Sequence, residues 1–276
     1  MLAAERHDRI LEELERRGTV RVSHLVRLLG VSDMTVRRDL DTLRQLGLLD
    51  KVHGGATLRR EGSTNEPGFA AKSARELVEK EAIAARAAGL VEPGSAIAIT
   101  AGTTTHALAR HLVGIPDLTV VTNSVQVADV LQAPERPDLT VLLTGGLRTP
   151  SDALVGPIAI ASLRSLHVDD VFMGVHGMDA KAGFTTPNLM EAETNRALVA
   201  SARRLVVVSD STKWGVLGLS TIVPLAEADV VITDTGLPDD AREVLRERVG
   251  ELVLVEPGAR GAPDAVRRDA EAAGHP

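Results

Sequence analysis

The sequence has no cysteine and very few aromatic residues. Its 276 residues include one Trp, three Phe and no Tyr. Without cysteine, disulfides and cysteine-ligated metal sites are excluded, and a reducing compartment such as the cytoplasm is expected. The shortage of aromatic rings argues against base stacking as a way to bind single-stranded nucleic acid. The core is therefore predicted to be aliphatic.

Long uncharged hydrophobic runs are also absent. No stretch of about 18 apolar residues lacks a charge, so no membrane span is expected. The first residues, MLAAERHDRI, carry charges where a signal peptide needs an apolar segment. The eight histidines are scattered, and neither glycine-rich nucleotide-binding motif occurs. We therefore expect no metal and no other cofactor.

The charges are unevenly distributed along the chain. Residues 1–60 carry 12 Lys and Arg against 9 Asp and Glu, whereas the rest carries 19 against 29, and the net charge is −7. A small basic end on a large acidic body fits an N-terminal module that binds a polyanion. The length of the chain also favours two domains.

Residues 1–59 show three helical patterns in short succession. The first two are predicted to end at Gly18 and Gly30, because glycine stops a helix. Their apolar stripes are Ile10, Leu11 and Leu14 in the first, and Val22, Leu25, Val26 and Leu29 in the second. Such spacing predicts helices that each bury one face.

The stretch GVSDMTVRRDLDTLRQLG, residues 30–47, predicts a third helix. Ser32 is suited to cap it, since a serine oxygen can accept a backbone N–H of the first turn. At about 100° per residue, the core side carries Val36, Leu40 and Leu43. The opposite side carries Thr35, Arg37, Arg38 and Asp41. Helix, short turn and second helix form the helix-turn-helix plan, whose second helix enters the major groove of DNA.

A basic hairpin is predicted directly after the third helix. In LGLLDKVHGGATLRR, apolar residues flank Asp50 and Lys51, and Gly54–Gly55 permit a sharp bend. A hairpin in this position would be the wing of a winged helix. Its cations, which would lie near DNA phosphates, are Lys51, His53, Arg59 and Arg60.

Arg37 and Arg38 have two explanations. Adjacent arginines taken alone are more often solvated charges on a helical bundle. The succession of helices, capping serine, outward arginines and basic hairpin favours DNA binding, in which arginine pairs with guanine or holds a phosphate. The predicted DNA-binding residues are Ser32, Thr35, Arg37, Arg38, Lys51 and His53.

Two motifs in this region carry a resemblance. VSDMTVRRDLDTL followed by VHGGA resembles the N-terminal signature of DeoR-type bacterial transcriptional repressors, over about residues 5–57. The chain departs from that pattern at Asp50, where the family usually has a basic residue. Lys51 is left as the cation at this point of the wing.

The chain changes character after the first domain. Residues 60–70 are rich in Gly, Ser, Asn and Pro and predict a linker, and residues 257–276 predict a disordered tail. Residues 71–256 begin with a helix through SARELVEKEAIAARAAGL and continue with apolar segments that alternate with helical ones. These segments are AIAIT, LTVVT, TVLLT, DDVFMGV, RLVVVSD, DVVITD and ELVLVE. Strands that are apolar throughout are buried on both faces, so we predict an α/β domain with a mostly parallel sheet.

Polar residues follow five of these strands. Ligands of open α/β folds bind where parallel strands end. The loops contain AGTTTHAL, Asn123–Ser124, Gly145–Gly146, HGMD and STKWG. Backbone N–H groups after Gly102 suit phosphate, while hydroxyls, amides and carboxylates suit a sugar. Each group also has a simpler explanation: threonines cap helices, Asp179 caps a turn, and Lys213 is a surface charge.

The second half also resembles the DeoR-type family. AGTTT, VVTNS, LLTGG, GMD with GFTT, and DSTKWG resemble its effector domain, from about Lys80 to Asp234, which is similar to the ribose-phosphate isomerase and CoA-transferase group. The resemblance implies that Gly102 to Thr105 hold a phosphate and that Lys213 and Asp179 line the same cleft. Thr100 and Asn195 depart from the family pattern. The predicted effector-binding residues are Gly102, Thr103, Thr104, Thr105, Asn123, Ser124, Gly145, Gly146, Asp179, Glu191 and Lys213.

A sugar-phosphate isomerase fused to a DNA-binding module is the alternative. Glu191 or Glu193 would be the base and Lys213 the electrophile of such an enzyme. The isomerases that this half resembles carry an Asp-Gly-Ala-Asp loop and a Lys-Gly-Gly-Gly loop, and the corresponding stretches here read VHGMD and TGG. We therefore predict binding without turnover.

Together these observations predict a cytoplasmic, operator-binding transcriptional regulator. Two-fold protein symmetry matches repeated half-sites in duplex DNA, so a dimer or tetramer is expected. The resemblance implies a repressor of sugar or carbohydrate genes that a phosphorylated sugar releases from its operator. No membrane partner is expected.

Overall fold

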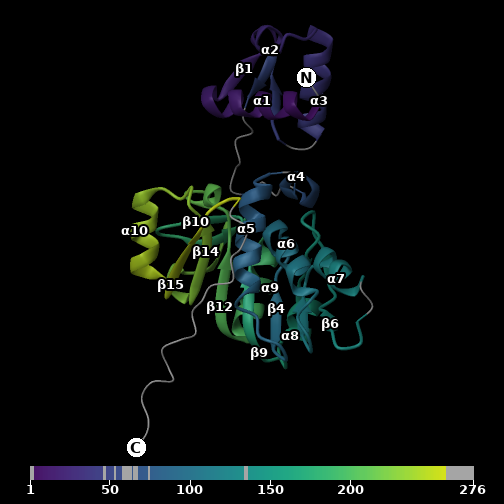
Figure 1. Cartoon of the computed structure of the whole chain (residues 1–276), viewed down its shortest axis with the longest axis vertical. Helices are drawn as coiled ribbons and strands as arrows, with labels where there is room; N and C mark the ends of the chain where they lie inside the picture. The colour runs from purple at the N-terminus through teal and green to yellow at the C-terminus, as the bar shows by residue number, and fades with distance from the viewer. Residues whose placement is uncertain are drawn as a thin grey trace, which may run out of the picture.

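The computed structural model describes residues 3–45, 48–52, 54–57, 64, 68–73, 75–133 and 136–258. Elements α1 to β3 form a small N-terminal domain, and elements α4 to β15 form a larger domain (Figure 1). None of the described helices is long and apolar enough to cross a membrane. The predicted linker and tail lie largely outside the described residues.

The small domain combines three helices with a three-stranded antiparallel sheet of order β1-β3-β2. Its elements are α1 (Ala3–Arg17), β1 (Thr19–Arg21), α2 (Val22–Leu29), α3 (Asp33–Gln45), β2 (Asp50–Val52) and β3 (Gly55–Thr57). Gly18 and Gly30 have left-handed backbones, with φ of 70° and 67°, which explains why the first two helices end there. The predicted hairpin is confirmed as β2 and β3. Strand β1 is too short for its sequence pattern to reveal.

Aliphatic side chains fill the core of the small domain, as predicted. All three helices contribute to it, and so do β1 and β3. Val36, Leu40 and Leu43 of α3 are at most 1% exposed. The back of α3 is therefore fixed against the core, and its polar front faces outward.

The larger domain is built on a seven-stranded parallel sheet of order β15-β14-β12-β9-β4-β5-β6. The predicted fold class is confirmed, and all seven predicted strands are present. They are β4 (Ala96–Ile99), β5 (Thr119–Thr122), β6 (Thr140–Leu143), β9 (Val168–Met173), β12 (Ala202–Val208), β14 (Val230–Asp234) and β15 (Glu251–Val255).

Two hydrophobic cores lie on the two faces of this sheet. In β12, Leu205 and Val207 belong to one core while Val206 and Val208 belong to the other, because side chains alternate along a strand. The first core includes residues of α8 (Pro157–Leu163), α9 (Leu189–Ala200) and α10 (Asp239–Arg248). The second includes residues of α5 (Leu77–Ala88), α6 (Thr103–Leu112) and α7 (Val125–Gln132).

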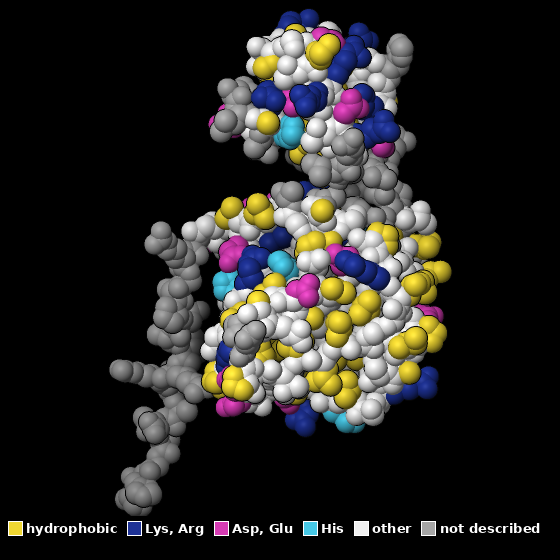
Figure 2. Space-filling model, turned by 90° about the vertical axis from the view of Figure 1, so that its right-hand side faces the viewer, with side chains coloured by type: hydrophobic (Ala, Val, Ile, Leu, Met, Phe, Trp, Pro, Cys, Tyr) yellow, Lys and Arg dark blue, Asp and Glu magenta, His cyan; other side chains and the backbone are white. Residues whose placement is uncertain are grey.

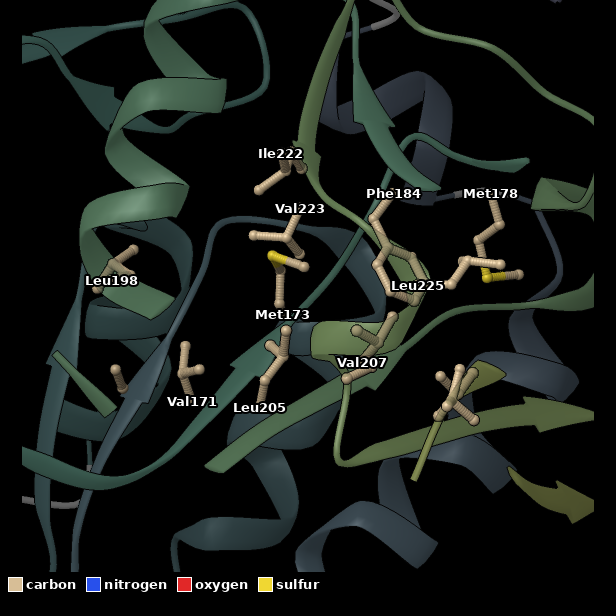
Figure 3. Packing of buried hydrophobic residues seen from close by; sticks show 14 of the residues in the cluster. Val171, Met173, Met178, Phe184, Leu198, Leu205, Val207, Ile222, Val223 and Leu225 are labelled. Atoms are coloured by element: carbon tan, nitrogen blue, oxygen red, sulfur yellow. The ribbon is translucent and has the colours of Figure 1, made fainter. Parts of the chain in front are cut away.

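Short elements that the sequence pattern does not predict complete the larger domain. Strands β10 (Gly177–Asp179), β11 (Gly183–Thr186) and β13 (Ser220–Val223) form an antiparallel sheet, whose Met178, Phe184 and Val223 pack in the first core (Figure 3). A hairpin consists of β7 (Leu147–Arg148) and β8 (Leu154–Val155). The remaining elements are α4 (Phe69–Ser73) and the 3₁₀ turns η1 (Ser211–Lys213) and η2 (Leu225–Glu227).

Two sequence predictions are wrong in detail. The helix expected from Ser73 is interrupted, because Glu76 has a left-handed backbone (φ 49°) and α5 begins only at Leu77. Strand β6 is apolar but is not buried on both faces. It lies at the edge of the sheet, and its Leu142 and Leu143 are 40% and 46% exposed.

Candidate functional site

The turn before α3 is formed as the sequence predicts. Gly30 closes α2 and donates its N–H to the backbone oxygen of Val26, at 3.0 Å. The N–H of Thr35 donates to Oγ of Ser32 at 3.2 Å, and the two hydroxyl oxygens lie 2.8 Å apart. Ser32 therefore caps α3 and fixes the position of its first turn.

Arg37 and Arg38 are both exposed but have different surroundings. Nε of Arg37 donates to Oδ1 of Asp33 at 2.5 Å, one helical turn away. The guanidinium of Arg38 makes no hydrogen bond or ion pair within the part of the chain that the structure describes. Arg38 is thus ready for an external anion, whereas Arg37 must share its charge with Asp33.

The wing and α3 are joined by an ion pair. Nζ of Lys51 lies 2.8 Å from Oδ1 of Asp41, on the outward side of α3. Asp50 is exposed at the start of β2. The predicted contacts of His53, Arg59 and Arg60 lie outside the described residues.

Two buried carboxylates hold α1 against the other helices. Asp39 of α3 accepts from Nε of Arg6 at 2.7 Å and lies 3.2 Å from Nε2 of His7. Burial alone would raise the pKa of Asp39, but the hydrogen bonds and charges of Arg6 and His7 together outweigh it and the pKa is lowered. Glu13 of α1 lies 2.7 Å from Nε2 of His24 on α2. Sequence reasoning misses both tethers because it does not show which acids turn inward.

A cleft of about 530 Å³ lies at the carboxyl ends of the central strands. Residues 102–104 after β4, 174–176 after β9 and 209–210 after β12 line it, together with residues of α5 and α9. Leu11, Glu12 and Leu48 of the small domain line it as well. The cleft is thus where topology predicts a ligand site, and residues of the small domain form part of its lining.

The loop after β4 points the amino end of α6 toward the cleft. Gly102 precedes α6 and offers no side-chain cap for its first N–H groups. Oδ1 of Asn123 accepts the N–H of Ala101 at 2.9 Å, and Oγ1 of Thr105 donates to the oxygen of Gly102 at 3.0 Å. These bonds fix the loop. Backbone N–H groups at the start of a helix attract anions.

Three lysines line the same cleft, namely Lys72, Lys80 and Lys213. Nζ of buried Lys80 donates to the backbone oxygens of Lys72 at 2.8 Å and Arg75 at 2.5 Å. Burial lowers the pKa of Lys80 to about 8, while nearby Asp210 acts to raise it. Sequence reasoning identifies Lys213 but misses Lys80, because Lys80 lies within a helix and not directly after a strand.

Glu191 organises the hydroxyl groups of the cleft. Its Oε1 accepts from Oγ1 of Thr149 at 2.9 Å and from Oγ of Ser151 at 2.6 Å, and its Oε2 accepts from Oγ1 of Thr186 at 3.1 Å. A carboxylate offers about four lone-pair positions, of which at least three are taken. This arrangement positions polar groups well but leaves little room for a general base to accept a substrate proton.

The cleft brings together only some of the predicted effector-binding residues. Gly102, Thr103, Thr104, Glu191 and Lys213 line it. The others do not, namely Thr105, Asn123, Ser124, Gly145, Gly146 and Asp179. Several of these have local structural partners, as their simpler explanations anticipate.

Three examples show these local partners. Ser124 caps α7 by accepting the N–H of Val127 at 3.2 Å. Oδ1 of Asp179 accepts the N–H groups of Lys181 and Ala182, both at 2.8 Å, and these bonds lower the pKa of Asp179. A β-carbon on Gly146 would lie 2.6 Å from the oxygen of Val155, so Gly146 allows close packing of β7 on β8.

The described residues offer no cluster of His, Cys, Asp or Glu that could hold a metal ion. The titratable groups that line the cleft are Glu12, Lys72, Arg75, Glu76, Lys80, His176, Glu191, Asp210 and Lys213. This set can bind an anion and hydroxyl groups.

Comparisons with known proteins assign both domains. The family described as the DeoR-like helix-turn-helix domain matches residues 6–61, and the family described as the DeoR C terminal sensor domain matches residues 75–235. Crystalline ribose 5-phosphate isomerase A from Neisseria gonorrhoeae is similar at 15% identity and a TM-score of 0.37, over 51% of this chain and 54% of that one. That likeness is too weak to support a conclusion.

Relatives match over nearly their whole length. The uncharacterized HTH-type transcriptional regulator YgbI of Escherichia coli K12 is 38% identical, over 93% of this chain and 99% of YgbI. A putative aga operon transcriptional repressor of Escherichia coli O157:H7 is 36% identical, over 91% and 94%. The glycerol-3-phosphate regulon repressor of Escherichia coli K12 is 31% identical, over 92% and 100%. The chain belongs to the DeoR family of helix-turn-helix transcriptional regulators and is a DNA-binding regulator, not an enzyme.

Proposed function

We propose that this protein represses genes of carbohydrate metabolism and leaves its operator when a phosphorylated sugar binds the cleft. The observation that carries the proposal is the chemistry of the cleft. It joins an uncapped helix start and three lysines, which suit phosphate, to Glu191 with its hydroxyl partners, which suits a polyol.

The names of the relatives point in the same direction. They include repressors of the aga operon and of the glycerol-3-phosphate regulon. These names give a carbohydrate context for the proposal, and the cleft gives the chemical class of the ligand. An effector changes the affinity for DNA only if it binds the DNA-competent and the DNA-incompetent arrangements of the protein with different affinities.

Arg38 is the proposed principal contact to DNA, with Ser32, Thr35 and Arg37 beside it on α3 and Lys51 on the wing. Arg38 is exposed and unpaired among the described residues, which suits a base edge or a phosphate. We further propose a homo-oligomer, dimer or tetramer, that presents two winged helices to a repeated operator in the cytoplasm.

A thermal-shift screen of sugar phosphates against the matching neutral sugars tests the ligand class. A ligand at 100 times its dissociation constant should add about 2.7 kcal/mol of stability. We expect phosphorylated compounds to raise the melting temperature while their neutral counterparts do not. Equal responses to both would refute a phosphate site.

The Lys213→Ala and Thr104→Ala variants test the location of the site. Both should bind the operator normally and respond weakly to the sugar phosphate that stabilises the wild type. Lys181→Ala, in the turn after β10 and outside the cleft lining, is the matched control and should respond fully. A normal response in both cleft variants would place the effector elsewhere.

A further inference from the structure

One side of the larger domain is unusually apolar. Six large side chains on β6, β7, α8 and the start of α9 are each at least 40% exposed. They are Leu142, Leu143, Leu147, Ile158, Leu189 and Met190. Figure 2 views the side on which β6 lies in Figure 1, and hydrophobic side chains gather there on the larger domain. We call these six residues the apolar strip.

The members of the apolar strip are neighbours in space. A β-carbon placed on Gly145, two residues after β6, would lie 3.7 Å from Cγ2 of Ile158. One placed on Gly156, which precedes α8, would lie 3.9 Å from Sδ of Met190. Leu147 pairs with Val155, directly before Gly156. The residues after β6 therefore lie against α8, and the start of α8 lies against the first turn of α9.

The strip includes an open edge of the main sheet. Strand β6 pairs with β5 on one side, and no other strand that the structure describes pairs with it on the other. Leu142 and Leu143 are adjacent and so point to opposite faces, yet both are exposed. Exposed apolar edge strands recruit another strand unless something covers them.

The charges beside the strip are neutralised within the chain. Arg136 pairs with Asp138 just before β6, and Arg148 pairs with Asp152 at 2.8 Å beside β7. Among the described residues, these two ion pairs add no net charge beside the strip. A two-fold interface brings a surface against its own copy, so a neutral apolar surface is complementary to itself.

The size of the strip also fits a second copy. Its six side chains expose on the order of 500 Å², a large part of the ~800 Å² that each partner buries in a standard interface. An apolar surface of about 300–600 Å² is the largest on a typical monomer and is often functional.

We infer that two copies of this chain associate through the apolar strip, with the β6 edges side by side about a two-fold axis. This inference rests on the proposed operator binding. The dimer would supply the two winged helices that an operator with two half-sites requires. It also connects the interface to the cleft. Helix α9 begins in the strip, and its Glu191, two residues after Leu189, lines the cleft.

Substitution of exposed leucines tests the interface. Leu143→Glu and Leu147→Glu place a charge in the strip, whereas Leu77→Glu places one on α5 at an exposure of 62%, outside the strip. Sedimentation equilibrium of the full chain should give dimers or dimer-based oligomers for the wild type and Leu77→Glu. The two strip variants should have a dissociation constant raised at least 100-fold. A monomeric wild type, or strip variants that associate like the wild type, would overturn the inference.

Because the chain has no cysteine, a single introduced thiol provides a second test of the interface that does not depend on weakening the dimer. Leu142→Cys and Leu143→Cys each introduce a single thiol at the β6 edge, and Leu77→Cys is the control. We expect mild oxidation to yield a covalent dimer from at least one edge variant and none from the control, since bridged Cα atoms must lie within about 7 Å. Cross-linking no faster than in the control would contradict the paired β6 edges.

Binding to DNA probes that contain one or two half-sites distinguishes a failure of this inference from a failure of the proposed function. Strip variants should bind a single half-site as the wild type does and lose the added affinity for a two-half-site operator. Monomeric variants that keep full operator affinity would leave the interface standing and refute the paired-operator mechanism. Intact effector stabilisation in the same variants would show that the cleft remains folded.

Discussion

The two domains use their buried carboxylates in different ways. In the small domain, Glu13 and Asp39 pair with arginine and histidine side chains and so hold helices together. Around the cleft of the larger domain, Glu191 accepts hydroxyl groups, and Asp234 accepts the backbone N–H of Ser211 at 2.7 Å and of Gly236 at 2.8 Å. These acids thus hold helices together in the small domain, whereas around the cleft they hold loops in place.

This difference also explains which cations remain available. On the inner side of α3, Asp39 pairs with Arg6 and His7. On the exposed side, Arg37 and Lys51 pair with acids of α3, whereas Arg38 faces outward without a partner among the described residues. In the cleft, Glu191 and Asp234 accept from uncharged donors, so these acids do not neutralise the lysines that line it.

Removal of Asp39 should give the largest effect on stability. Asp39→Ala leaves Arg6 and His7 without their shared partner, and loss of one member of a buried pair costs on the order of 3 kcal/mol. Urea unfolding of the full chain should show the small domain melting earlier while the larger domain is unchanged. Asp41→Ala, which removes the exposed pair with Lys51, should cost less than about 1 kcal/mol. Equal losses in the two variants would contradict the tether.

Arg38→Ala should weaken operator binding by about 1–3 kcal/mol, or roughly 5- to 150-fold. Arg37→Ala should have a smaller effect, because Arg37 already shares its charge with Asp33. Fluorescence anisotropy at a fixed salt concentration measures both. Arg27→Ala, an exposed arginine on α2, is the control for net charge. If Arg37→Ala proves the more damaging, the distinction between the two arginines fails.

The pH dependence of effector binding should identify Lys80. Its pKa of about 8 means that a rise from pH 7 to pH 9 removes most of its charge, so affinity for a sugar phosphate should fall roughly tenfold. Calorimetric titration should show this fall in the wild type and a flatter profile in Lys80→Met.

The stability of the unliganded protein should change in the opposite direction. Burial lowers the pKa of Lys80 from 10.5 to about 8, so the unfolded chain binds more protons between these values. Stability should therefore rise with pH across this interval. A parallel fall of affinity and stability would exclude Lys80 as the group responsible.

The smallest expected effect concerns Glu13. Hydrogen bonds from Arg16, helped by His24 and Arg17, lower the pKa of Glu13 from 4.5 to about 2. A carboxylate with a depressed pKa stabilises the fold above its unfolded pKa and loses this contribution as the pH falls toward 2. Glu13→Gln should therefore be less stable than the wild type at pH 7, and circular dichroism should show the gap closing in acid. A constant gap would argue against the ionic tether.

Much of the fold could be predicted because its signals are local. The seven apolar strands, the capping Ser32 and the glycine stops depend on nearest neighbours along the chain, and all were found. Strand β1 and the sheet of β10, β11 and β13 could not be predicted, since pairing over distant segments stabilises strands that are too short to show a pattern.

The candidate site was only partly predictable for the same reason. The loops after β4, β9 and β12 meet at the cleft, whereas the predicted residues after β5 and β6 do not line it, and five of the predicted effector residues do. Lys80 was missed because it approaches from a helix, and Asn123 reaches the loop at Ala101 instead of the cleft.

The sequence by itself determined the two-domain plan, the outward arginines, the parallel sheet and the edge at which a ligand would bind. These features follow from the spacing of hydrophobic residues, from helix-capping residues and from the positions of glycines. Each of these signals acts over only a few neighbouring residues of the chain. Only the tertiary structure decided which acids are buried, that Lys80 and Lys213 line the same cleft, and that β6 lies at the edge with its leucines exposed. Burial and charge pairing depend on distances between segments far apart in sequence, and folding alone sets those distances.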